Sequence, residues 1–307
     1  MTLVLSVQTK GSIWMVADRR LTINNKVMKE DARKIVKLRT TDGVAMIGYA
    51  GLGATRSGTE PSTWIANVLR GRNLLLQPAL NILADALKRE FPPQLRGIED
   101  FAHVMVVPAI VEGRQRLYSI DLVKQTGRTF YRYSRHITRE PMTSRSPTYA
   151  IFIAGSGAHL LMRKESWKRP LLRLVKAYNK GRVCPKVIAD HLAAICYGVH
   201  KGMMQKGDRT VGPKSIVAWS DASLGGGQLT YNGEQEEASA STVPVIDKGM
   251  DVQAVGTALM QPLMEHAMGM MRALEQGVPI EQIQPPSEAA LKGALDKLPS
   301  EPDEKLR

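Results

Sequence analysis

The chain has 307 residues, 43% of them hydrophobic, which is enough apolar material for one large core or two ordinary domains. Its 42 Lys and Arg against 29 Asp and Glu give a net charge of +13, a balance that suits an acidic partner or a nucleic acid. No apolar run reaches the length of a membrane span, and the first one lacks the basic start and cleavage site of a signal peptide, so we expect a cytoplasmic protein without a membrane segment.

The distribution of charge argues against nucleic acid. Between residues 157 and 214 there are 13 Lys and Arg against three acidic residues, interleaved with Leu and Val at helical spacing. The aromatic residues that line single-strand binding surfaces are missing from this pattern. We therefore interpret the run as the basic outer faces of core helices, although an acidic partner or an assembly surface would explain the charge equally well.

The cysteines and histidines form no ligand pattern. Cys184 and Cys196 are the only cysteines, so neither a disulfide framework nor a zinc site is indicated, and we expect reduced thiols. His191 and His200 lie nine residues apart without further ligand-type neighbours. We expect no metal and no cofactor.

The chain begins with two short apolar runs joined by a glycine turn. Residues 2–8 and 12–17 are rich in β-forming residues and flank Lys10-Gly11, a pattern typical of a β-hairpin. A hairpin at this point would hold the amino-terminal residues in a sheet, where termini are otherwise loose.

Two helices and a set of strands are predicted next. The helices cover residues 61–69 and 78–91, and Pro92-Pro93 ends the second. The strands expected in the middle of the chain cover residues 103–110, 116–121, 129–139 and 148–154.

The second half returns to helices. The elements expected there are helices over 158–177 and 185–204, strands over 215–219 and 227–231, a loop over 233–241, a helix over 251–275 kinked at Pro262, and a short helix over 287–298. Five methionines between residues 260 and 271 are interpreted as an adaptable packing or subunit surface. From residue 277 the chain is Pro-rich and charged, with a disordered end.

Thr2 is the first candidate for chemistry. If Met1 is removed, the chain begins with a residue that carries both a hydroxyl and a free α-amine, so one residue supplies a nucleophile and a base. The ordinary pKa of an α-amine is about 7.7–8.0, and a nearby cation lowers it. Lys34 is the candidate cation, and Asp18, at the end of the returning strand, is the candidate partner of Lys34.

The spacing of these residues resembles that of a known family. Counted from Thr2, Asp18 lies 16 residues on, Arg20 lies 18 on and Lys34 lies 32 on, which is similar to proteasome β-type N-terminal-nucleophile (Ntn) hydrolases. Val27-Met28-Lys29, Arg33-Lys34 and Gly48-Tyr49-Ala50-Gly51 resemble the HslV-type bacterial peptidases in particular. A short insertion at residues 40–43 falls where we expect a hairpin turn.

The resemblance continues in two glycine-containing turns. Gly155-Ser156-Gly157 follows an apolar strand and matches the family motif whose serine lies beside the catalytic threonine. Asp208 and Gly212 match a later Asp-x-x-Ser-Gly motif, except that Val211 stands at the serine position and Thr210 is one place away. Either Thr210 replaces that serine, or the hydrogen-bonding network around the amine is reduced.

The resemblance implies an α+β fold, a four-layer αββα sandwich of two antiparallel sheets with a C-terminal helical extension. The expected units are a hydrolase domain over residues 1–232, a loop and helical extension over 233–276, and a partly disordered tail over 277–307. The similarity covers roughly residues 2–232.

The implied activity is that of a threonine endopeptidase. Thr2 Oγ would attack a peptide carbonyl with the Thr2 amine as base, assisted by Lys34, Asp18, Ser156 and Asp208. The oxyanion would be bound by the amide of Gly51, which the motif favours, or of Gly48, which the distance from Thr2 favours. Leu21, Ala32 and Val36 would line an apolar primary pocket.

The resemblance also implies partners and leaves two rival functions. A homo-oligomeric ring acting on peptides or unfolded protein is expected, and an ATP-dependent unfoldase is compatible with it. One rival is a small-amide amidohydrolase of the same fold. The other is a non-catalytic structural or scaffold subunit, which Val211 and the long tail favour.

Overall fold

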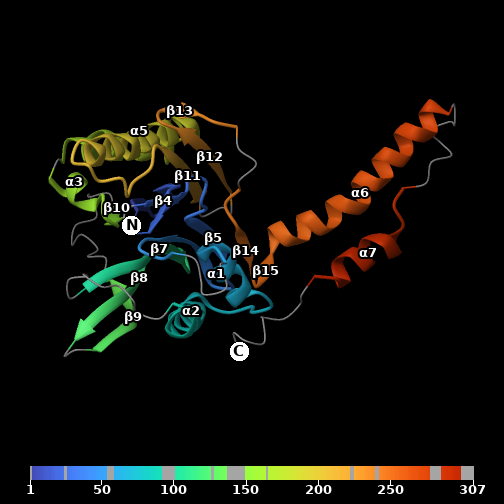
Figure 1. The fold of residues 1–307 in the computed structure, drawn as a ribbon, viewed down its shortest axis with the longest axis horizontal. Coiled ribbons are helices and arrows are strands. Elements are labelled where there is room, and N and C mark those ends of the chain that lie inside the picture. The colour runs from blue at the N-terminus through green and yellow to red at the C-terminus, as the bar shows by residue number, and fades with distance from the viewer. Residues whose placement is uncertain are drawn as a thin grey trace.

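The computed structural model describes residues 2–23, 26–53, 59–91, 101–125, 128–136, 149–163, 165–221, 225–238, 242–276 and 285–298. In these residues the chain is an α+β protein built on two main sheets (Figure 1). The predicted hairpin at the amino terminus is confirmed, because β1 (Val4–Thr9) pairs antiparallel with β2 (Ser12–Asp18) and places Val4 opposite Ala17.

The first sheet has six strands in the order β10-β1-β2-β11-β12-β13, and every pair is antiparallel. The strands that join the hairpin are β10 (Tyr149–Ala154), β11 (Lys214–Asp221), β12 (Gly226–Asn232) and β13 (Gln235–Glu236). The hairpin is therefore central, and both of its strands are buried along their whole length.

The second sheet has seven strands in the order β15-β14-β5-β6-β7-β8-β9. Their bounds are β5 (Ile35–Arg39), β6 (Gly43–Tyr49), β7 (Phe101–Val111), β8 (Arg114–Gln125), β9 (Arg128–His136), β14 (Val245–Asp247) and β15 (Met250–Asp251). Only β14 and β5 run parallel in this sheet. A separate ribbon consists of β3 (Leu21–Ile23) and β4 (Lys26–Lys29).

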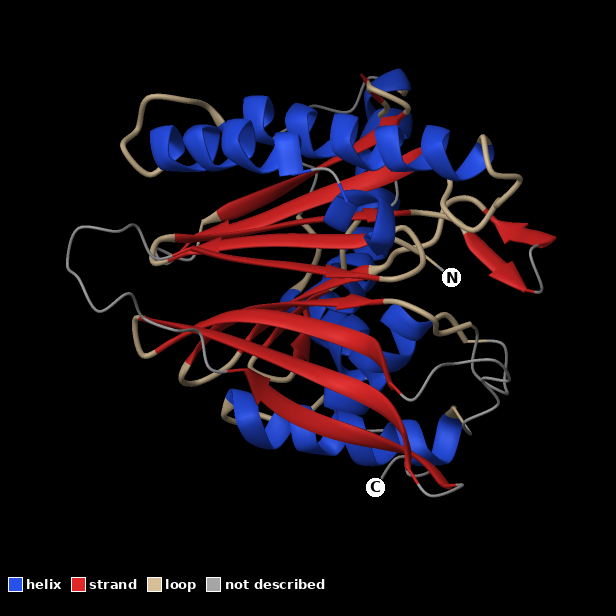
Figure 2. Cartoon of the chain, turned by 90° about the vertical axis from the view of Figure 1, so that its left-hand side faces the viewer, coloured by secondary structure: helices blue, strands red, loops and turns tan. Residues whose placement is uncertain are grey.

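Helices cover the two sheets on different sides. They are α1 (Pro61–Leu69), α2 (Leu76–Glu90), α3 (Ala158–Arg163), α4 (Lys168–Tyr178) and α5 (Pro185–Met204), with a 3₁₀ turn at Glu165–Trp167. Two further helices, α6 (Val252–Glu275) and α7 (Glu288–Asp296), have no buried residue and cover neither sheet (Figure 1). In Figure 2 the sheets lie one above the other, with long helices above the upper sheet and below the lower one.

Three apolar clusters hold these parts together. One joins the second sheet to α1 and α2, and another joins the first sheet to α3, α4 and α5. The third lies between the sheets and contains Val4 and Met15 from the first and Ile35 and Met46 from the second. Because Leu3 and Leu5 face the helices while Val4 faces the other sheet, the first strand is apolar on both sides.

The described chain departs from the predicted elements at four places. The helix predicted over 158–177 is two helices separated by the 3₁₀ turn, and Pro170 stands in the first turn of α4, where it needs no hydrogen-bond donor. The loop predicted over 233–241 contains the short strand β13. Strands β3 and β4 of the separate ribbon were not predicted. Strands β14 and β15 were not predicted either, and they extend the second sheet beyond residue 232.

Other predictions agree with the structure. The insertion at residues 40–43 forms the turn between β5 and β6, closed by the Thr40 amide on the Gly43 carbonyl at 2.9 Å. The helix predicted over 251–275 is α6, which continues on both sides of Pro262, and the kink expected at Pro262 stays a prediction. Residues 137–139 of the predicted strand 129–139 and the end of the tail from residue 299 lie outside the described residues. No helix among the described residues is long and apolar enough to cross a membrane.

Candidate active site

Thr2 lies two residues before the start of β1 and is buried, with 2% of its surface exposed. The amide of Leu3 donates to Asp18 Oδ1 at 2.7 Å, which fixes the backbone beside Thr2. On the other side, Gly155 has a φ of +94° and lies against the Thr2 carbonyl so closely that a Cβ atom would overlap it. The glycine of the predicted Gly-Ser-Gly turn therefore allows the turn to approach Thr2.

Asp18, the last residue of β2, has no exposed surface and is surrounded by hydrogen-bond donors. Its Oδ1 atom accepts from the Thr2 hydroxyl and from the Leu3 amide. Its Oδ2 atom accepts from Lys34 Nζ at 3.1 Å, from the Arg20 amide at 3.1 Å and from the Gly212 amide at 3.2 Å. Five donors hold this carboxylate in one orientation.

Lys34 completes the group just before β5. Its Nζ donates to Thr2 Oγ1 at 2.5 Å, to Asp18 Oδ2 at 3.1 Å and to the Arg20 carbonyl, so all three of its N–H groups have acceptors. The side chain is 1% exposed. Burial lowers the pKa of Lys34, and the charge of Asp18 opposes that shift.

The three residues that the sequence singled out therefore meet at one oxygen atom. Thr2 Oγ1 donates to a carboxylate and accepts from an amine whose pKa is lowered by burial. A hydroxyl held in this way is oriented and lies beside a positive charge, which are two requirements of an activated nucleophile. The spacing of 16 and 32 residues brings these groups together because β1 and β2 pair closely while β5 belongs to the facing sheet.

The two candidate glycines for the oxyanion amide lie in different surroundings. Gly51 has a φ of +75° and borders a small cavity of about 30 Å³ together with Thr2, Lys34 and Tyr49. Gly48 lies inside β6, in register with Ile35 and Val106, and a Cβ atom there would lie 2.6 Å from Met15 Sδ in the facing sheet. The structure thus places Gly51 at the cavity and Gly48 in the contact between the sheets.

The predicted primary-pocket residues do not gather at this cavity. Leu21 borders it, whereas Ala32 and Val36 have no exposed surface, and Val36 packs in the cluster under α1 and α2. Residues 54–58, which follow the cavity-lining Leu52 and Gly53, lie outside the described residues.

Ser156 and Thr210 form a pair of hydroxyls next to Thr2. Ser156 Oγ donates to the Thr2 carbonyl at 3.4 Å and lies 2.8 Å from Thr210 Oγ1. Asp208 Oδ1 accepts from the Thr210 amide at 2.8 Å, while Val211 is fully buried in the core. Of the two neighbouring positions, Thr210 brings its hydroxyl to the site, and Asp208 positions Thr210 without a contact to Thr2 among the described hydrogen bonds.

Three contributors to this site had no role predicted from the sequence. The Gly212 amide binds Asp18, and the Arg20 carbonyl binds Lys34. The Arg20 guanidinium pairs with Glu30 and donates to the Arg209 carbonyl at 3.1 Å, so it ties the loop of Gly212 to the end of β2. Tyr49 borders the cavity and donates to the Arg33 carbonyl at 2.8 Å. All three residues stand in the motifs that resemble the family, but the Gly212 amide and the Arg20 carbonyl are backbone atoms, which carry no residue-type signature of their role.

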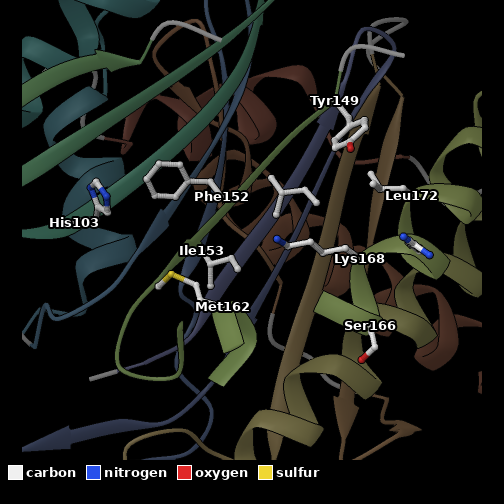
Figure 3. Close-up of a pocket in the computed structure, with 10 residues that line it drawn as sticks. His103, Tyr149, Phe152, Ile153, Met162, Ser166, Lys168 and Leu172 are labelled. Carbon is white, nitrogen blue, oxygen red and sulfur yellow. The ribbon is translucent and has the colours of Figure 1, made fainter. Parts of the chain in front are cut away.

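A larger cavity of about 880 Å³ lies elsewhere, along β10 between α4 and the start of β7 (Figure 3). Its walls include His103, Phe152 and Lys168, and neither Thr2 nor Lys34 borders it. Thr2, Lys34 and Gly51, for which the sequence predicts a chemical role, therefore border the smaller cavity and not the larger one.

The side chains that could act as metal ligands do not cluster among the described residues. Within the ranges that the structure describes, no group of three or more His, Cys, Asp or Glu side chains could hold a metal ion. Cys184 is exposed and Cys196 is buried, and neither is in a disulfide. His200 contacts the Val211 carbonyl at 2.9 Å, and burial lowers the pKa of His191.

No protein-family model matches this sequence, and no curated protein is similar to it.

Proposed function

We propose that this chain is a threonine peptidase of the proteasome type, an N-terminal-nucleophile hydrolase. The observation that carries the proposal is the placement of Thr2 Oγ1 between Lys34 Nζ, at 2.5 Å, and the Asp18 carboxylate. Burial of a lysine and an aspartate beside one threonine hydroxyl lowers the stability of the fold. A catalytic role for these residues would explain why the fold contains them.

The proposed architecture is a four-layer αββα sandwich. Support comes from the apolar cluster between the two sheets and from the two further clusters that join each sheet to its own helices. In this arrangement the threonine lies just before a central strand of one sheet, while Lys34 lies just before β5 and Gly51 just after β6, two inner strands of the other sheet.

Removal of Met1 is the first step of the proposed mechanism, because it frees the α-amine of Thr2. The amine takes the proton from Thr2 Oγ as this oxygen forms a bond to the carbonyl carbon of the substrate. The positive charge of Lys34 disfavours protonation of the amine beforehand, and Asp18 holds Lys34 in place. The amine then gives its proton to the leaving nitrogen as the peptide bond breaks.

The negative charge that develops on the carbonyl oxygen requires a donor. We assign this role to the amide of Gly51, since this residue borders the cavity and its left-handed backbone suits glycine. Loss of one such donor typically lowers the rate about 10²–10³-fold. A water molecule then attacks the ester on Thr2 and releases the second product, with the amine again as base.

The hydroxyls of Ser156 and Thr210 have a supporting role in this scheme. They form a connected pair next to the Thr2 backbone, and Asp208 holds Thr210 in its turn. In the proposed scheme they orient the amine of Thr2, which lies on the same residue as the carbonyl that Ser156 contacts.

The substrates that we propose are peptides or unfolded protein, cleaved within a homo-oligomeric ring that an ATP-dependent unfoldase could serve. A second candidate is an amidohydrolase acting on a small amide. The observation that favours it is the size of the cavity beside Thr2, about 30 Å³, which is room for little more than a water molecule.

Hydrolysis of fluorogenic peptides by the purified chain tests the proposal. Thr2→Ala should lower the rate at least about 10³-fold and Thr2→Ser should retain part of it, because serine keeps both the hydroxyl and the amine. Thr41→Ala, the same substitution in an exposed turn, is the matched control and should leave the rate unchanged. A Thr2→Ala variant as active as wild type would refute the proposal, and hydrolysis of small amides without hydrolysis of peptides would favour the second candidate.

A further inference from the structure

Lys34 stands at the end of a stretch of chain without regular structure. Residues 31–34, which the structure describes in full, join β4 to β5 and lie in neither a helix nor a strand. The carboxyl side of Lys34 is fixed by the second sheet, because the Tyr49 amide donates to the Lys34 carbonyl at 3.2 Å and Ile35 pairs with Gly48. The position of Lys34 therefore depends also on what holds Arg33, the residue before it.

Glu60 holds the amide of Arg33. Its Oε1 atom accepts from the Arg33 N–H at 2.5 Å, and its side chain is 13% exposed. The other carboxylate oxygen, Oε2, accepts from Lys29 Nζ at 3.1 Å. Glu60 directly precedes α1, in which Thr63 Oγ1 accepts from the Arg33 guanidinium at 2.9 Å. The start of α1 therefore binds both the backbone and the side chain of the residue before Lys34.

The carbonyl of Arg33 is held from the second sheet. The Tyr49 hydroxyl donates to it at 2.8 Å. Burial, and after it the charge of Glu60, raises the pKa of Tyr49 well above its ordinary value. The hydroxyl therefore keeps its proton and remains a donor. Both polar backbone groups of Arg33 thus have a side-chain partner, the N–H in Glu60 and the carbonyl in Tyr49.

Support of the helix does not explain the orientation of Glu60. This residue occupies the N-cap position of α1, where a side chain commonly accepts from the free amides of the first turn. Within the described chain, however, the Glu60 side chain makes no capping hydrogen bond to the helix. Its carboxylate is directed instead to the peptide group next to Lys34.

We propose that Glu60 is a positioning residue for Lys34, which it fixes by holding the Arg33 peptide group together with the Tyr49 hydroxyl. This inference rests on the proposed function, because Lys34 Nζ lies 2.5 Å from Thr2 Oγ1 and its charge disfavours protonation of the Thr2 amine. Without Glu60 the Arg33 peptide is released and Lys34 moves away from Thr2. The pKa of the amine then rises, and the base of the reaction is protonated at neutral pH.

The pH dependence of kcat/KM for peptide hydrolysis tests this role, since its acidic limb reports the protonation of the base in the free enzyme. In Glu60→Ala this limb should move to higher pH by about half a unit, and kcat/KM at neutral pH should fall about 10-fold. Loss of the negative charge of Glu60 alone would act in the opposite direction, because that charge stabilises the protonated amine. Glu60→Gln keeps an oxygen acceptor for the Arg33 amide, so its limb should lie at or below that of wild type and most of the activity should remain.

Two further variants complete the test. Tyr49→Phe releases the carbonyl of Arg33 without a change of charge, so its limb should also move to higher pH, and it provides the measurement if Glu60→Ala does not fold. Glu234→Ala is the matched control, because Glu234 also pairs with a lysine, Lys201 at 3.7 Å, but at an exposed position. Its profile should equal that of wild type. The charged residues of the candidate site are the same in every variant, namely Asp18, Arg20, Lys34 and Asp208.

The possible results separate this inference from the proposed function. Unmoved limbs in Glu60→Ala and Tyr49→Phe, with Thr2→Ala inactive, would overturn the positioning role and leave the proposed function intact, even if the rates were lower at every pH. A limb that Glu60→Ala and Glu60→Gln both move to lower pH would overturn it as well, because Glu60 would then act only through its charge. A Thr2→Ala variant as active as wild type would refute the proposed function and this inference with it.

Discussion

Replacement of Lys34 with methionine tests how the carboxylate of Asp18 is held in the interior. In the wild type Asp18 has no exposed surface and accepts five hydrogen bonds, one of them from Lys34. Removal of one partner of a buried ion pair typically costs about 3–5 kcal/mol, because the other charge remains in a low dielectric. Three backbone amides and the Thr2 hydroxyl stay on Asp18, each worth about 1 kcal/mol, so we expect a cost near the lower end, about 3 kcal/mol.

The companion variants separate the ion pair from its surroundings. Asp18→Asn leaves Lys34 without its counter-charge, but burial already lowers the pKa of Lys34, so the lysine can become neutral and the cost should be about 2 kcal/mol. The double variant buries no charge and should cost about 2 kcal/mol less than the two single changes together. Urea unfolding at neutral pH measures all three. Single costs that add to the double cost within about 0.5 kcal/mol would refute the view that these residues form a coupled pair.

Three further perturbations follow from the geometry. Gly155→Ala should displace Thr2 and abolish peptide hydrolysis. Gly181 also has a positive φ but open space around it, so Gly181→Ala is the control and should keep activity. Equal activities of the two variants would contradict the close approach of Gly155 to Thr2. Burial lowers the pKa of Lys37 from 10.5 to about 8, so the unfolded chain binds more protons between these values. The unfolding free energy of wild type should therefore rise relative to Lys37→Met between pH 8 and 10.5, by on the order of 3 kcal/mol, and a constant difference across that range would argue against a buried lysine. A thiol reagent should modify Cys184 in the native protein and Cys196 only after unfolding, since burial raises the pKa of Cys196; rapid modification of both would mean that α5 is open.

Much of the fold could be predicted from local patterns. The hairpin of β1 and β2 follows from alternating β-forming residues around Lys10-Gly11, and the helices α1, α2 and α5 follow from their periodicity. The break between α3 and α4 had a signal in Pro170, which cannot continue a helix from residue 158 without losing a backbone hydrogen bond. The strand β14 had no such signal, because its parallel partner β5 lies more than 200 residues earlier in the chain.

In the candidate site, the residues that could be predicted contribute side chains, and those that could not contribute backbone atoms. Thr2, Asp18 and Lys34 could be found from residue type and spacing because each contributes a chemically distinct side chain. The Gly212 amide and the Arg20 carbonyl contribute backbone atoms, which every residue possesses, so only the fold reveals them. The choice between Gly51 and Gly48 also needed the structure, since it depends on which glycine borders the cavity.

The most direct test of the proposed activity is the intact mass of the purified chain before and after reaction with an epoxyketone, which requires a hydroxyl and a free amine on the same terminal residue. The proposal predicts a chain without Met1 that gains one adduct, mapped to Thr2 and absent from Thr2→Ala. A folded chain that retains Met1 and takes up no adduct would contradict catalysis by Thr2.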